Sequence, residues 1–196
     1  MFALLLAGFA LGAEPADLDK PMSVRVDSDA TWGIGGQMFL GTQAHVVVGH
    51  RLWQGSSVSV GLDVGVQGAW HHEPVFMAPW IDPEEVQGAV NRGQVVLSAG
   101  PHLRFGAKGR TTLALHAIAG LNHWRSAYTL EYDAVDVSGS MVVRRTTPVV
   151  GGQLTLMVRA SERVGVNLVI GAPAPLPSSY AVGMTWVGIG PSFVLR

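Results

Sequence analysis

The chain has 196 residues, no Cys and a formal net charge of −1, and only 14% of its residues are charged, against about 25% in a typical soluble domain. A disulfide scaffold is therefore excluded, and the absence of a basic run argues against a nucleic-acid partner. Mean hydropathy is +0.30, yet no apolar run reaches the roughly 18 residues that a membrane helix needs. One β-rich domain with few surface charges is expected.

The N-terminal stretch, residues 1–13, is apolar and ends in small residues, which predicts a signal peptide. A buried helix of a cytosolic domain is the alternative. Residues 14–30 are then expected as a periplasmic N-terminal segment, and residues 31–196 as the folded domain.

From about Thr31 onward the apolar residues recur with a period of two, which predicts strands. The stretch from Ser57 to Trp70 is the clearest, with branched apolar side chains at even positions and small or polar ones at odd positions. Eight strands are predicted, over residues 32–40, 44–52, 57–70, 94–105, 111–123, 148–160, 164–170 and 180–195. The last strand changes parity, which predicts a β-bulge near Trp186–Val187.

The charges inside these strands all share the face that carries Gly, Ser and Gln, whereas the apolar face carries none. An uncharged face is what lipid demands, because an Arg or Lys facing lipid at mid-depth costs about 2–4 kcal/mol. We therefore predict an all-β fold, an antiparallel up-and-down transmembrane β-barrel of eight strands with its polar face inside. The expected interior polar network consists of Arg51, Asp63, His102, Arg104, His116 and Arg159.

The connections alternate between short turns and long links, which is typical of outer-membrane barrels with periplasmic turns and extracellular loops. Both termini are then periplasmic, and the outer-membrane lipid surrounds the barrel. The first hairpin is expected near residues 40–43. Loops 71–93 and 125–146 are candidates for binding an extracellular partner, and oligomeric state is left open.

Two of these loops have predicted structure of their own. A short helix is expected from Asp82 through Val90, because an N-cap, a first-turn Pro and an acid follow in order. Residues 128–136 and 140–145 are expected to form a hairpin about a Ser138–Gly139 turn. Its arms would be joined by cross-arm pairs of opposite charge: Glu131, Asp133 and Asp136 with Arg144 and Arg145.

Aromatic residues fall near the predicted strand ends, as in the interface girdles of membrane barrels, although strand ends of other β proteins carry aromatics too. Trp53 and Trp124 have the wrong parity to face lipid. The expected interface aromatics are Trp32, Trp70, Phe105, Tyr180 and Phe193.

With this pattern the chain resembles the small eight-stranded outer-membrane barrels of Gram-negative bacteria, the class that includes the OmpA membrane domain. The resemblance covers roughly residues 31–196 and rests on architecture rather than on a motif. It implies a small barrel whose interior is filled by side chains.

No cofactor and no metal is expected. His71, His72 and His123 are weak metal candidates, and their interpretation as polar loop residues is preferred because no ligand spacing links them. The favoured function is a structural or loop-mediated binding role without an open pore or enzymatic activity. A lipid-modifying outer-membrane enzyme and a soluble lipocalin-like binder of an apolar ligand are the alternatives.

Overall fold

The computed structural model describes residues 22–34, 38–75, 86–106, 109–132, 137–176 and 184–195. In these ranges no helix is long and apolar enough to cross a membrane. The eight strands are β1 (Met22–Ile34), β2 (Met38–Gln54), β3 (Val58–Val75), β4 (Val86–Phe105), β5 (Thr111–Tyr132), β6 (Val137–Arg159), β7 (Val164–Pro175) and β8 (Thr185–Leu195).

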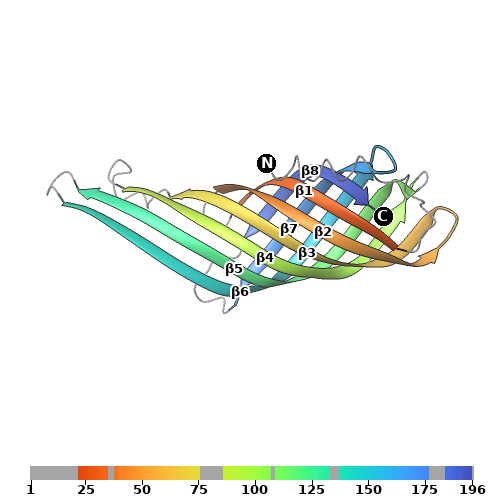
Figure 1. Ribbon diagram of the computed structural model, residues 1–196, viewed down its shortest axis with the longest axis horizontal. Helices are drawn as coiled ribbons and strands as arrows, with labels where there is room; N and C mark the ends of the chain where they lie inside the picture. Colours follow the sequence, from red (N-terminus) through yellow and green to blue (C-terminus); the bar gives the residue numbers. More distant parts are fainter. Residues whose placement is uncertain are drawn as a thin grey trace.

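The strands form a closed antiparallel barrel in sequence order, and β1 completes it by pairing with β8 from Val24↔Leu195 to Ile34↔Thr185 (Figure 1). The predicted up-and-down eight-stranded barrel is thereby confirmed. The start of β1 and the end of β8 lie at the end of the barrel that carries the turns at 55–57 and 160–163. We call this end the turn end and the opposite one the loop end.

The barrel is much longer on one side than on the other (Figure 1). β5 and β6 have 22 and 23 residues, whereas β7 and β8 have 12 and 11. β6 pairs with β7 only from Val149 onward, but it stays paired with β5 up to Tyr132↔Val137. Residues 122–132 and 137–147 therefore project past the shorter strands, and we call them the arm.

Two expectations about the N-terminal part are wrong. The barrel begins at Met22, inside the segment 14–30 that was expected to precede it, and the strand expected over 32–40 instead spans the end of β1 and the beginning of β2. The first hairpin turn consequently lies between Ile34 and Met38, not near residues 40–43. The early part of β1 was missed because its lipid-side positions include Ser28 and Ala30, so that the apolar alternation is weak.

Three local predictions at the loop end are also wrong. Pairing of β8 with both neighbours runs without a shift at Trp186–Val187, because Trp186 points into the barrel and is 1% exposed. The expected helix over residues 82–90 is strand from Val86 onward, and its beginning lies outside the described residues. The arm is the predicted hairpin, but Ser138 and Gly139 are paired residues of β6 rather than its turn.

The expected charge pairing along the arm differs as well. Arg144 lies opposite Arg125, Arg145 opposite Trp124, and Glu131 opposite Ser138. Asp133 and Asp136 lie outside the described residues. The register therefore places two arginines, rather than an acid and a base, directly across from each other.

Inner and outer faces follow the predicted parity. Along β7, exposed and buried residues alternate at every position. Inward residues at the loop end form two apolar clusters, one around Phe39 and Trp186 and one of Val96, Ile118 and Val149. The interior has room for the large indole because Gly171 faces it, where a Cβ would overlap the Trp186 ring. The bulge was therefore predicted where the chain instead buries a tryptophan.

Candidate functional site

The polar interior is organised around Asp63 on β3, which is 3% exposed. His102 Nδ1 on β4 donates to Asp63 Oδ1 at 2.7 Å, and His116 Nε2 on β5 lies 3.2 Å from Asp63 Oδ2. Both carboxylate oxygens are thus engaged by imidazoles from the next two strands. These two contacts replace part of the hydration that the carboxylate loses when it is buried.

A second group of buried acids comes from β1 and was missed, because these residues were assigned to the segment before the barrel. Arg25 Nε donates to Asp27 Oδ2 at 2.9 Å, and Ser192 Oγ donates to Asp27 Oδ1 at 2.6 Å. Asp29 accepts from Gln43 Nε2 at 2.8 Å and from Asn167 Nδ2 at 3.2 Å. A signal existed in the sequence: charges at positions 25, 27 and 29 lie on one face of a strand.

The remaining expected network residues lie nearer the turn end and do not contact Asp63 by a hydrogen bond in the described structure. Arg104 Nη2 donates to Ser23 Oγ at 2.7 Å, and Arg159 Nη2 donates to the Gly109 carbonyl at 3.3 Å. Arg51 is half-buried at the same end. The six residues therefore split into a carboxylate–imidazole centre and an arginine group.

A metal site from His71, His72 and His123 is contradicted by the geometry. Successive residues of a strand point to opposite faces, so that His71 is buried against Phe39 while His72 is exposed and bonded to Asn91. His123 is exposed and hydrogen-bonded to Thr146 Oγ1 at 2.8 Å. In the described part of the chain, no three His, Cys, Asp or Glu residues group to hold a metal ion.

One serine–histidine contact can be compared with hydrolase chemistry, since a histidine beside a serine could act as its base. His45 Nε2 and Ser98 Oγ are 2.8 Å apart. Both side chains are inside the barrel, at 1% and 2% exposure. A lipid chain on the outer wall does not reach them, so the contact serves the interior packing.

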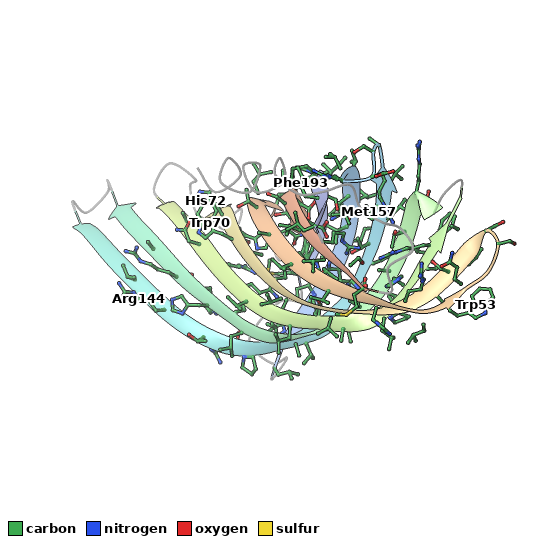
Figure 2. All side chains as sticks on the ribbon, turned by 45° about the vertical axis from the view of Figure 1, so that its right-hand side comes forward. Trp53, Trp70, His72, Arg144, Met157 and Phe193 are labelled. Carbon is green, nitrogen blue, oxygen red and sulfur yellow. The ribbon has the colours of Figure 1, made fainter. Side chains whose placement is uncertain are left out.

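The outer wall carries the aromatic residues at both ends. Trp32 and Trp70 are exposed, Phe105 and Phe193 are half-buried, and Tyr180 lies outside the described residues. Trp53 was expected to face inward, which is wrong: it is 58% exposed, because the β2–β3 register shifts between Arg51 and Trp53. Figure 2 shows Trp53 at the turn end and Trp70 beside His72 toward the other end.

Comparison with solved structures finds the same barrel at low sequence identity. The attachment invasion locus protein Ail of Yersinia pestis, in complex with the heparin analogue sucrose octasulfate, is 11% identical, with 89% of this chain and 97% of that chain covered and a TM-score of 0.50. A major outer membrane protein of Thermus thermophilus is 13% identical, with 88% and 99% covered and a TM-score of 0.52. No protein-family model and no curated protein matches the sequence. The chain thus has the fold of small outer-membrane β-barrels.

Proposed function

We propose that this chain is an outer-membrane protein with a closed barrel that holds the arm at the outer surface for binding, with both termini in the periplasm. The observation that carries this proposal is a sharp change in the chemistry of the outward face along the long strands. Rows of paired residues on neighbouring strands show the chemistry of the outward face before and after this change.

The apolar part of the outer wall has the height of a membrane. On β3 the outward residues from Val58 to Trp70 are apolar or glycine, which corresponds to about 40 Å along the strand and about 30 Å across a bilayer after a tilt of about 40°. An apolar band of about 25 Å with aromatic borders is typical of outer-membrane barrels. This wall supports insertion in lipid.

In the row directly beyond Trp70 the outward residues are polar on all four long strands. Trp70 lies in one paired row with Gly93, His123 and Thr146. The next row toward the loop end contains His72, Asn91, Arg125 and Arg144. Cationic and amide groups are costly in hydrocarbon, so this second row supports a membrane boundary at this level of the strands.

The arm is exposed on both faces over residues 142–146 (Figure 2). In the closed part of the barrel only every second residue of a strand is exposed, because the others point into the lumen. This segment extends beyond the closed ring, so its inward-pointing side chains are exposed as well. Val142, Val143 and three arginines therefore stand in solvent: Arg125, Arg144 and Arg145. Such a projecting two-faced surface supports a binding role.

The interior supports a closed barrel. Large buried side chains fill the space between the strands. Trp186 and Phe39 lie toward the loop end, and the Asp63 centre lies nearer the turn end. Eight strands leave a lumen that side chains can fill. A soluble binder with an apolar cavity would need the opposite arrangement, with the apolar face inside.

Single-cysteine labelling tests this topology cleanly, because the chain has no cysteine of its own. In a Gram-negative host, Val143→Cys on the arm should react with a membrane-impermeant maleimide in intact cells. Glu162→Cys, in the exposed 160–163 turn, is the matched control and should react only after the outer membrane is permeabilised. The reverse pattern, or equal labelling in intact cells, would contradict the proposed orientation.

A further inference from the structure

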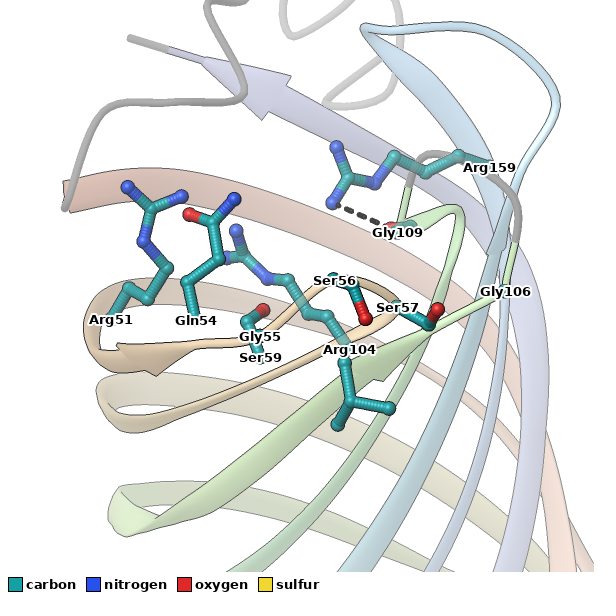
Figure 3. A pocket seen from close by; sticks show the side chains of 11 residues that line it. Arg51, Gln54, Gly55, Ser56, Ser57, Ser59, Arg104, Gly106, Gly109 and Arg159 are labelled. Carbon is teal, nitrogen blue, oxygen red and sulfur yellow. Dashed lines mark hydrogen bonds between the residues drawn. The ribbon is translucent and has the colours of Figure 1, made fainter.

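At the turn end the barrel opens into a cavity of about 360 Å³ (Figure 3). It lies between the β2–β3 and β4–β5 turns, with Arg159 of β6 on its wall. Its volume lies at the lower end of the range for small-molecule sites. Its lining residues are Arg51, Gln54, Gly55, Ser56, Ser57, Val58, Ser59, Arg104, Gly106, Gly109 and Arg159.

Among the described residues, the lining has three guanidinium groups and no carboxylate. All three arginines sit at inward positions of their strands, so that their side chains converge from β2, β4 and β6. Three serines add hydroxyl groups to the same wall. The described part of this cavity is therefore a concentrated positive site with additional hydrogen-bonding groups.

Two of the guanidinium groups are held in place by neutral acceptors. Arg104 donates to the Ser23 hydroxyl, and Arg159 donates to the Gly109 carbonyl (Figure 3). The Nε atoms of both arginines are buried and have no hydrogen-bond partner among the described residues. These contacts orient the two side chains without neutralising their charge.

The buried acids Asp63 and Asp27 already have hydrogen-bond partners of their own. Asp63 uses both oxygens for His102 and His116, and Asp27 accepts from Arg25 and Ser192. Because a buried charge is costly unless it is paired, Arg104 and Arg159, whose described hydrogen-bond acceptors are neutral, favour an anion from outside the chain.

We propose that this turn-end cavity is a binding site for an oxyanion of the phosphate class. Guanidinium groups bind such anions through paired, charge-assisted hydrogen bonds, and several oxygens on one centre allow groups from three strands to share it. A phosphate monoester or a phospholipid headgroup presents the same chemistry. The compartment that supplies the ligand rests on the proposed orientation, whereas the binding itself does not.

Calorimetric titration of the purified, folded full chain with inorganic phosphate tests the site, in a non-ionic detergent that contains no phosphate. We expect saturable binding that weakens as chloride increases, because added salt screens the charges. Arg104→Gln and Arg159→Gln should each weaken it by about tenfold or more, the effect of losing one charged hydrogen bond. Absence of saturable binding by the unchanged chain would overturn the proposal, whatever the labelling experiment shows.

Arg110→Gln is the matched control, because Arg110 is exposed in the β4–β5 turn and does not line the cavity. Its affinity should equal that of the unchanged chain, and a loss as large as that of Arg104→Gln would overturn the site. Heat-dependent gel mobility verifies that each variant is folded. If Arg104→Gln does not fold, Arg159→Lys tests the same point, since it retains the charge but loses the planar fork and should bind more weakly.

A short-chain phosphatidic acid distinguishes the two sources of the ligand. If it displaces bound phosphate, the site accepts a lipid headgroup, and if phosphate binds but is not displaced, the ligand is a soluble phosphate compound. Both results support an oxyanion site. Displacement that is as strong in Arg159→Gln as in the unchanged chain would place the lipid elsewhere and overturn the assignment.

Discussion

Two groups of three arginines, at opposite ends of the molecule, have the same chemistry and different surroundings. At the turn end Arg51, Arg104 and Arg159 point inward from three separate strands and line one cavity. On the arm, Arg125 and Arg144 lie directly opposite each other on the outward face, and Arg145 lies opposite Trp124. The first group converges and the second is spread over a solvent-exposed surface.

The difference shows what barrel closure contributes. Where the ring is complete, a strand sends alternate residues to lipid and to a lumen, and inward residues of distant strands meet. Where β5 and β6 project past the shorter strands, residues 142–146 are exposed on both faces, and Arg125 and Arg144 are paired side by side on an exposed wall instead of converging on a lumen. The same residue type therefore makes a site in one region and a solvated surface in the other.

The largest expected effect comes from removing the central acid of the closed region. Asp63→Ala leaves His102 and His116 without their shared acceptor in a lumen rich in arginine, and should lower the free energy of unfolding from lipid vesicles by about 3–5 kcal/mol. Asp63→Asn, which retains an acceptor, should cost less. Arg144→Ala on the arm should change it by no more than about 0.5 kcal/mol, and equal losses at the two sites would contradict the distinction.

A charge on the outer wall tests where the membrane ends. Leu115 is 58% exposed within the apolar wall, and Val142 is 50% exposed on the arm. Leu115→Arg should cost about 2–4 kcal/mol of unfolding free energy in vesicles, because the charge faces hydrocarbon. Val142→Arg should cost almost nothing, and a comparable loss would mean that the arm also lies in lipid.

Two glycines of β3 allow an inward position to be compared with an outward position on the same strand. A Cβ at Gly61 would overlap the His50 backbone oxygen and the His102 ring, whereas a Cβ at Gly68 meets nothing within 4 Å. Gly61→Ala should therefore destabilise the barrel by about 1–3 kcal/mol through overpacking. Gly68→Ala should be neutral or slightly stabilising. Equilibrium unfolding of both variants in the same vesicles gives the comparison, and equal values would contradict the assigned faces.

The smallest effect is expected on the arm itself. Arg144→Glu would replace a like-charge pair with an opposite-charge pair to Arg125, which stabilises paired strands by about 0.2–1 kcal/mol. Amide hydrogen exchange in residues 122–132 and 137–147 should slow, while exchange in β7 and β8 should not change. Arg144→Gln removes the repulsion alone and should give an intermediate rate; faster exchange in Arg144→Glu would show that the two residues do not face each other.

The sequence could predict which face each residue occupies, because side-chain direction along a strand is local. Asp63, Arg104 and Arg159 were placed on the inner face from parity, the eight strands followed from segments with a period of two, and the uncharged face gave the side that faces lipid. Parity failed where a local irregularity intervened, as at Trp53, where the register shift after Arg51 turns the indole outward.

By itself, then, the sequence determined the fold class and the sorting of side chains between lumen and outer wall, since both depend on a repeat of two residues. The tertiary structure decided which inward residues meet. Asp63 contacts His116 two strands away, and Arg51, Arg104 and Arg159 share a cavity, because closure and stagger set the height of each strand in the ring. It also decided that Gly171 makes room for Trp186, a match between two strands that no pattern within one strand contains.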